Sequence, residues 1–477
     1  MTSLLDPGLA VVSVGLDSFN ASLRSSGAPV TQVEWQPPGA GDPKLAWLLA
    51  ELASDPARPD SLGARIDRAN QVAVERILSS QTMLVDVAAH ARDLWPDIGR
   101  TLLHAGAPVA WRDMCGPMHG AMIGAVLYEG WASSAEEARG MLERGEIPFA
   151  QCHDFGAVGP MTGIISSSMP VLVAKNTTHG NTAYTNINEG IGKVLRFGAN
   201  SAEVIARLEW FENVLAPALK AALAAGGPID LKSIQSQALL MGDEVHSRNA
   251  AATALFFMRL AVGMAKSGVD REVQHAVLKF IADTSQFFLN LSMVSSKAIM
   301  DSARDIEHAT IVTATARNGT ATAIRVSALG RQWFAAPSAM PVGLFFPGFR
   351  QEDACPDLGD SAICETAGFG GFSFAASPAL TLLAGGTVAQ SMEYSQLMYA
   401  ITAGRNPGSS LPALDFAAAP VGIDVRKVVD TGIRPVVTTG IAHREAGVGQ
   451  IGAGIVRVPM ACYVDALQAM AETYLES

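Results

Sequence analysis

The chain changes its pattern at residues 202–211, which read AEVIARLEWF. Apolar side chains recur here every three or four residues. They are Val204, Ile205, Leu208 and Phe211. This spacing is the period of an amphipathic helix, and a similar apolar spacing returns at residues 255–260. We therefore expect residues 202–301 to be almost continuously helical, and this helical stretch decides the fold.

Both flanks of the helical stretch carry strand signals. On the N-terminal side, β-rich runs at residues 10–15 and 29–35 enclose two helical turns. On the C-terminal side, the runs 310–315 and 323–327 are joined by Asn318-Gly319, a turn dipeptide typical of β-hairpins. Strands and helices therefore alternate before and after the helical stretch.

The length of the chain, 477 residues, exceeds one typical domain of about 100–200 residues. We predict a mixed α+β fold in which two α/β domains flank a mainly helical middle domain. The predicted boundaries are 1–201, 202–305 and 306–477.

The charge balance limits the partners of the protein. The 34 Lys and Arg residues against 45 Asp and Glu residues give a net charge of −11, without a basic block. Such a surface argues against binding nucleic acid or an anionic membrane. No basic residue precedes Asp6, so the N-terminus does not predict a signal peptide, and we expect a cytoplasmic protein.

One uncharged run, residues 366–392, is long enough to cross a bilayer. Its five glycines and Pro378 divide it into short pieces. A spanning helix would need the freed backbone groups to be satisfied elsewhere in the protein. We therefore expect buried loops and strands here, and no membrane anchor.

Standard catalytic motifs are absent from the sequence. The five cysteines contain no C-x-x-C pair. We therefore predict neither a disulfide framework nor a zinc knuckle. Residues 447–452 fit G-x-G-x-x-G, but residues 455–458 after them favour a strand rather than the helix of a dinucleotide site. No cofactor is therefore predicted.

Polar residues gather with histidines in four stretches, at 114–120, 151–155, 176–188 and 241–249. In the last, Asp243 and His246 would share a helix face, where a carboxylate can orient a general base or both can hold a metal. Two ligands are too few to predict a metal site, although a divalent ion stays an open alternative. Turn-forming amides and surface salt bridges explain such stretches equally well.

The first and fourth of these stretches are part of a pattern that resembles the YahG/YlbE-like family of bacterial proteins, which includes the AllG subunit of oxamate carbamoyltransferase. The matching segments span nearly the whole chain. They are residues 115–130, 157–161, 188–200, 241–249, 287–293, 316–319, 359–363 and 440–450.

The resemblance implies carbamoyl transfer in allantoin breakdown. The group would move between phosphate and oxamate or a similar amide, giving or consuming oxalurate. The resemblance also implies a partner subunit of the FdrA type. We further expect a homo-oligomer.

Carbamoyl phosphate is doubly charged and its carbonyl oxygen becomes an oxyanion on attack, so its site needs cations, amide donors and a proton carrier. From residue chemistry we predict that His119 and His246 carry protons or stabilise the oxyanion, and that Asp243 orients His246. The predicted anion clamps are Lys193, Arg248 and Arg317. The predicted readers of carbonyl and amide groups are Asn181, Asn188 and Asn249.

Two alternatives stay open at this point. One is an amide or ureide hydrolase that uses Cys152 beside His153, or a metal at Asp243 and His246. The other is a scaffold subunit that stabilises a partner carrying the chemistry.

Overall fold

The computed structural model describes residues 11–14, 17–33 and 37–475. Its helices are α1 (Asp17–Ser25), α2 (Pro43–Glu51), α3 (Leu62–Ser79), α4 (Ala91–Leu94), α5 (Gly116–Tyr128), α6 (Ala135–Glu143), α7 (Ala202–Trp210), α8 (Ala216–Gly226), α9 (Leu231–Leu240), α10 (Ala250–Lys266), α11 (Arg271–Asp283), α12 (Phe288–Asp301), α13 (Ile363–Thr366), α14 (Thr381–Ala384), α15 (Val388–Met398), α16 (Val425–Thr431) and α17 (Met460–Leu475).

The strands are short, and they are spread along the chain. They are β1 (Val11–Val14), β2 (Val30–Val33), β3 (Thr82–Ala88), β4 (Leu102–His104), β5 (Phe149–Gln151), β6 (Ala157–Val158), β7 (Val171–Asn176), β8 (Thr182–Thr185), β9 (Ile229–Asp230), β10 (Val312–Asn318), β11 (Ala321–Val326), β12 (Phe334–Pro337), β13 (Val342–Phe345), β14 (Leu358–Gly359), β15 (Thr402–Leu411), β16 (Ala417–Ile423), β17 (Val436–Ala442) and β18 (Gln450–Arg457).

The strands form several small sheets rather than one large one. The largest has the order β6-β8-β7-β3-β9, and two others have the orders β12-β11-β10-β14 and β13-β18-β17. Neighbours in these three sheets run antiparallel, except that β6 is parallel to β8. Small sheets together with many helices confirm the predicted mixed α+β class.

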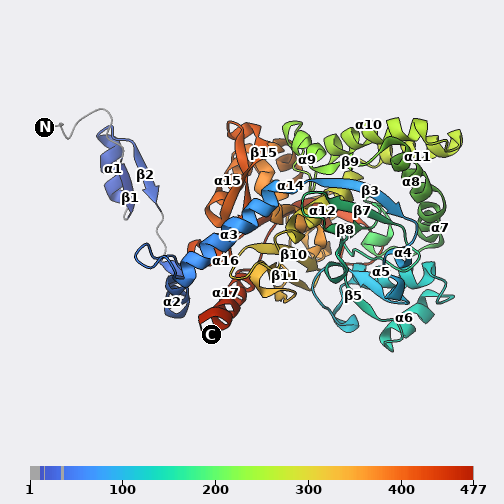
Figure 1. Cartoon of the computed structure of the whole chain (residues 1–477), viewed down its shortest axis with the longest axis horizontal. Helices are drawn as coiled ribbons and strands as arrows, with labels where there is room; N and C mark the ends of the chain where they lie inside the picture. Colours follow the sequence, from blue (N-terminus) through green and yellow to red (C-terminus); the bar gives the residue numbers. More distant parts are fainter. Residues whose placement is uncertain (1–10, 15–16, 34–36, 476–477) are drawn as a thin grey trace.

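Helix α12 lies at the centre of the molecule, and residues 288–300 of it are all buried. It packs against β7 and β8 of the largest sheet (Figure 1) and also contacts α13. Its polar side chains find protein partners: Asn290 donates to Asn186, and Ser292 donates to the carbonyl of Val245. A helix buried on every side is stable here because its polar groups are hydrogen-bonded.

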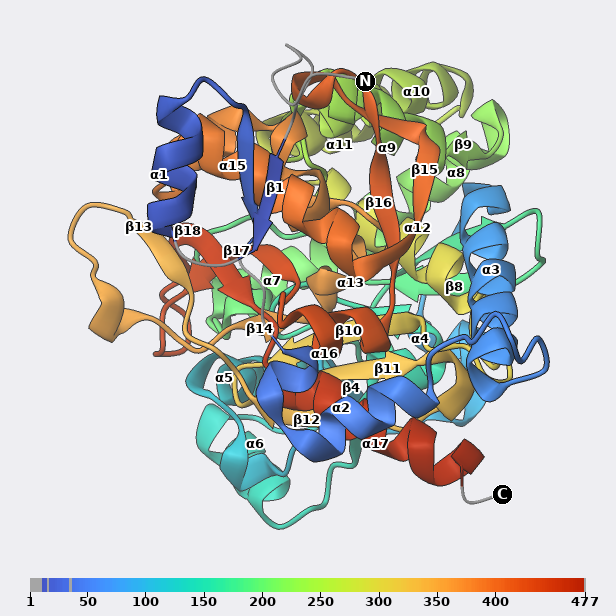
Figure 2. The same ribbon diagram turned by 90° about the vertical axis from the view of Figure 1, so that its left-hand side faces the viewer.

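The C-terminal helix closes a second layer. Helix α17 packs on β11 and β12 and also contacts α16 and α2, as the view in Figure 2 shows. Helices α8 and α10 form a separate contact. Gly226 and Gly263 let the backbones of these two helices approach closely.

The core crosses the predicted boundaries at 201/202 and 305/306. One apolar cluster contains Leu172, Leu239 and Ile363, which come from the three predicted regions. The division into three domains stays a prediction.

Most predicted elements are present. Residues 202–301 are largely helical, the predicted hairpin is β10–β11, and Ser134 caps α6 by accepting from the backbone N–H of Glu137. The pair β15–β16 was not predicted, because its residues, TAGRNPGSSL and AAAPVGI, lack a strand pattern.

The uncharged run 366–392 is divided among short helices and turns, including a 3-10 segment at Gly370–Ala376 and α14. In the part of the chain that the structure describes, no helix is both long and apolar enough to cross a membrane. The expectation of strands in this run was wrong.

Candidate functional site

A histidine and a carboxylate form a buried pair near the centre of the molecule. Both carboxylate oxygens of Glu365, in α13, lie 2.8 Å from Nδ1 of His246. His246 belongs to the irregular segment 241–249 between α9 and α10. The side chains are only 4% and 2% exposed, so water screens the interaction little.

The carboxylate of Glu365 is held from several directions. Its Oε1 also accepts from the backbone N–H groups of Gly371 and Thr438, each at 3.0 Å. A carboxylate fixed in this way directs the proton of His246 to Nδ1. Nε2 of His246 has no hydrogen-bond partner among the described residues, so it is left as a proton acceptor.

A second buried carboxylate, Glu244, lies next to this pair. The hydroxyl of Thr438 is 3.0 Å from Oε1 of Glu244 and 3.3 Å from Oε1 of Glu365. Burial raises the pKa of Glu244 to about 7, although the nearby His246 and backbone N–H donors act in the opposite direction. Glu244 therefore changes its protonation state near neutral pH.

Asp243 does not orient His246, which corrects the prediction from the sequence. Its carboxylate instead accepts from Nε of Arg248 at 3.1 Å and from the backbone N–H of Ala252 at 2.9 Å. The segment is not helical, because Gly242 and Val245 both have positive φ angles. Asp243 and His246 consequently do not share a helix face.

Arg196 supplies a buried cation that is linked to the segment through Gln286. Its Nε donates to the carbonyl of Gly190 at 2.7 Å and its Nη2 to Gln286 at 3.2 Å. Gln286 in turn donates to the carbonyl of Ser247, beside His246. Burial lowers the pKa of Arg196 to about 10, and the charge of Glu189 opposes that shift.

Three buried polar atoms on residues linked to His246 by the chain or by hydrogen bonds have no hydrogen-bond partner in the described structure. They are Nη1 of Arg196, Oγ of Ser247 and Oδ1 of Asn249. Buried polar groups in proteins are nearly always paired, so an unpaired group of this kind requires an explanation. Together with Nε2 of His246 they provide donors, acceptors and a positive charge for a small polar ligand. We call these four residues with Glu365 the His246 site.

Other predicted residues lie near this site in different roles. Asn188 donates to Asn290 and accepts from the backbone N–H of Gly190, so its amide holds the loop that Arg196 contacts. Lys193 follows on the same loop and is exposed. Asn249 donates to the carbonyl of His246, and Arg248 remains partly exposed beside Asp243.

Arg317 is buried and engaged by protein groups. It forms an ion pair with Asp357, with Nε 2.7 Å from a carboxylate oxygen, and Nη1 donates to the carbonyl of Gly359. Burial opposes its charge, but the carboxylates of Asp357, Glu365 and Asp360 together outweigh this effect and raise the pKa of Arg317. Its geometry is that of a structural ion pair.

His119 and Asn181 line other hollows. His119 donates from Nε2 to the carbonyl of Trp111 and faces a hollow that also contains Arg139. Among the described residues, no hydrogen bond or ring contact joins it to His246. Asn181 donates to the carbonyl of Ala298 beside a different, arginine-lined hollow.

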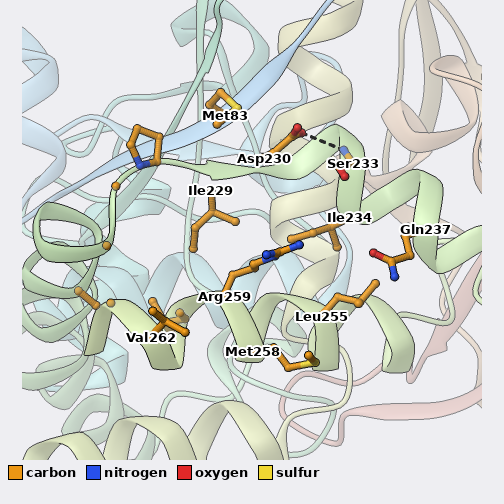
Figure 3. A pocket seen from close by; sticks show the side chains of 16 residues that line it. Met83, Ile229, Asp230, Ser233, Ile234, Gln237, Leu255, Met258, Arg259 and Val262 are labelled. Carbon is orange, nitrogen blue, oxygen red and sulfur yellow. Dashed lines mark hydrogen bonds between the residues drawn. The ribbon is translucent and has the colours of Figure 1, made fainter. Parts of the chain in front are cut away.

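A hollow of about 680 Å³ lies between α8, α9 and α10 (Figure 3). Its ionisable lining residues are Asp230 and Arg259. Asp230 accepts from the backbone N–H of Ser233 and thereby caps α9, and Arg259 extends across toward Ile234. This hollow therefore offers no pair of groups suited to proton transfer.

Metal ligands do not gather anywhere in residues 11–14, 17–33 and 37–475. No three His, Cys, Asp or Glu side chains there are arranged so that they could hold an ion. The carboxylates of Glu365 and the neighbouring Glu244 instead accept from N–H and O–H donors.

Comparison with known proteins decides the family. The uncharacterized protein YahG of Escherichia coli K12 is 42% identical over 99% of this chain and 99% of its own length. The chain belongs to the YahG/AllG-like family. The oxamate carbamoyltransferase subunit AllG of the same organism is 48% identical over 86% of this chain and 98% of its own length.

Two further matches agree with this family. The family model for the oxamate carbamoyltransferase subunit AllG matches residues 147–361, which include Arg196, Glu244 and His246. A crystal structure of a conserved protein of unknown function from Enterococcus faecalis V583 superposes with a TM-score of 0.84. It is 43% identical and covers 87% of this chain and 99% of that one.

Glu365 and Arg196 stood among the polar residues noted in the sequence, but no role was predicted for either. Glu365 is 119 residues from His246, and it precedes a glycine-rich run that had no assigned role. Arg196 was visible as a cation near Asn188 and Glu189, but its burial was not. A charged residue inside an otherwise apolar run, VLRFGA, was the available signal.

Proposed function

We propose that the chain is a carbamoyltransferase subunit that moves a carbamoyl group between phosphate and oxamate or a similar amide. Membership of the YahG/AllG-like family and the name of the AllG relative support a role in oxamate metabolism. The observation that carries the proposal is the His246–Glu365 pair, linked through Ser247 and Gln286 to Arg196, whose Nη1 has no partner in the described structure.

In the proposed reaction the amide nitrogen of oxamate attacks the carbonyl carbon of carbamoyl phosphate. The new C–N bond forms, the C–O bond to phosphate breaks, and the products are oxalurate and inorganic phosphate. Nε2 of His246 takes the proton from the attacking nitrogen and passes it to the departing phosphate. The proton balance of the protein is therefore unchanged after one turnover.

Arg196 has the complementary role of holding negative charge. A guanidinium that is buried with one free nitrogen binds an oxyanion more strongly than an exposed one, because water competes less. In the proposal Nη1 of Arg196 donates to a carboxylate or phosphate oxygen, and Oγ of Ser247 donates a second hydrogen bond.

The hydrolase alternative receives less support from the contacts of Cys152. Its thiol is buried and donates to the carbonyl of Gly163. Burial and the charge of Asp360 raise the pKa of Cys152 well above its ordinary value, so the thiolate that a nucleophile requires is disfavoured.

The partner and the location are part of the same proposal. The relative is named as a subunit, which supports action in a complex. We propose a partner of the FdrA type, assembly of this chain as a homo-oligomer within that complex, and a cytoplasmic location.

The test is transfer by the purified chain together with an FdrA-type partner from the same organism. Oxalurate and phosphate formed from carbamoyl phosphate and oxamate are measured for wild type, His246→Gln and the exposed control His275→Gln. We expect His246→Gln to lose roughly 10²–10⁴-fold in rate, as for removal of a general base, and His275→Gln to match wild type.

Circular dichroism and the oligomeric state check that each variant is folded. Full activity of folded His246→Gln would remove the His246 site from the reaction and favour the scaffold role. Absence of any transfer by wild type with its partner would overturn the substrate assignment itself.

A further inference from the structure

A second polar hollow lies apart from the His246 site and has no role in the proposed reaction. It measures about 630 Å³ and opens between the end of α3, the start of β8 and the residues that follow α12. We call it the arginine hollow. Its charged lining residues are Arg76, Arg304, Arg331, Asp154, Asp301 and Asp305.

Two of the three acidic groups each form an ion pair with a buried cation. Arg325, which is 3% exposed, lies 2.6 Å from Asp154, and Lys297, which is 1% exposed, lies 2.6 Å from Asp301. Buried cations held this close to a carboxylate cancel most of its field. Asp154 and Asp301 therefore leave little negative charge for the hollow itself.

The arginines of the hollow are less fully paired than these acids. Arg304 lies 3.7 Å from Asp301 and 4.0 Å from Asp305, beyond normal hydrogen-bond distance. Arg331 is exposed and has no hydrogen bond or ion pair among the described residues. Counting the two buried cations, positive groups outnumber negative ones here, although the whole chain carries −11.

Unpartnered polar atoms continue behind the wall of the hollow. Oδ1 of the lining residue Asn181, Nε of Arg325 and Nε1 of Trp333 are all buried without a partner in the described structure. The guanidinium of Arg325 lies 4.1 Å from the ring of Trp333. Two of these atoms, Nε of Arg325 and Nε1 of Trp333, are unused donors behind a wall with a local positive excess, which favours an anion over a solvated surface.

We propose that the arginine hollow binds a small oxyanion, a carboxylate or a phosphate group, separately from the His246 site. Arg304 and Arg331 provide guanidinium groups that fit either kind of oxyanion. The inference does not depend on carbamoyl transfer, since none of the lining residues belongs to the His246 site.

The test follows the fluorescence of Trp333 while the full-length protein is titrated with inorganic phosphate and, separately, with oxalate. Trp333→Phe identifies the part of the signal that comes from Trp333, which contacts Arg325 behind the lining residue Asp154. We expect saturable binding of at least one anion, weakened roughly tenfold or more by Arg331→Ala, the loss expected for a charge-assisted hydrogen bond. The exposed control Arg112→Ala should bind like wild type.

The two probes also separate the ligand classes. Saturation by phosphate alone indicates a phosphate-bearing ligand, and saturation by oxalate alone indicates a carboxylate. No saturable signal with either anion, or unchanged binding in both Arg331→Ala and Arg304→Ala, would overturn the proposal. His246→Gln should keep the signal while losing transfer, so failure of one proposal is distinguishable from failure of the other.

Discussion

Glu365 contacts His246, Gly371 and Thr438 at once, and it is the residue on which the geometry of the His246 site most depends. Residue chemistry in the sequence nominated His246 as a candidate proton carrier, and that role stays a prediction. It selected the wrong carboxylate, because Asp243 is near in sequence whereas Glu365 is near only in space. Single residues can be nominated from a sequence, but their partners depend on the tertiary structure.

Glu244 yields a prediction about pH and stability. Its pKa is raised from 4.5 to about 7 by burial, so the folded protein keeps the proton over a range where the unfolded chain has lost it. The stability that this carboxyl contributes is complete below about pH 4.5 and is lost as pH rises through about 7. We expect wild type to lose about 3 kcal/mol relative to Glu244→Gln across that interval.

Urea unfolding midpoints of wild type and Glu244→Gln at several pH values measure this difference. The exposed control Glu352→Gln should keep a constant offset from wild type over the same range. A constant offset for Glu244→Gln as well would show that Glu244 titrates normally.

At the scale of elements, the sequence predicted where helices and strands lie better than where helices stop. The apolar period identified residues 202–301, yet it did not show the interruption at 241–249 that carries His246. That interruption depends on Gly242 and Val245 in positive φ, and Val245 is a residue type that rarely adopts it. Strand pair β15–β16 was missed because its residue types do not favour strands. It is defined only by the pairing between its two strands.

Gly371 links an element contact to the site and provides a second prediction. A Cβ added there would lie 2.1 Å from the carbonyl oxygen of Val436 in β17. Gly371→Ala must therefore push the 370–376 segment away from β17 and weaken the hydrogen bond from Gly371 to Glu365. We expect a loss of about 1–3 kcal/mol in stability and a fall in transfer rate per folded molecule.

Gly263→Ala is the matched control for this change. Its Cβ would lie 2.3 Å from the carbonyl oxygen of Ala222, where α8 and α10 meet. Urea midpoints should fall for both variants, and only Gly371→Ala should lose transfer. Equal transfer rates in the two variants would show that Glu365 has no part in the reaction.

At the scale of the whole molecule, the His246 site is assembled from all three regions of the predicted division. Arg196 comes from the first region, His246 and Ser247 from the helical one, and Glu365 from the third. Apolar spacing and strand signals predicted the class of fold, and the charge balance argued against nucleic-acid and membrane partners, which stays a prediction. They could not predict this assembly, because contacts such as that between His246 and Glu365 join segments more than a hundred residues apart.

The most direct measurement is a crystal structure of the protein with oxamate bound. We expect the carboxylate of oxamate within hydrogen-bond distance of Nη1 of Arg196, and its amide nitrogen facing Nε2 of His246. Oxamate bound elsewhere in the molecule, with Nη1 of Arg196 still unpartnered, would contradict the assignment of the His246 site.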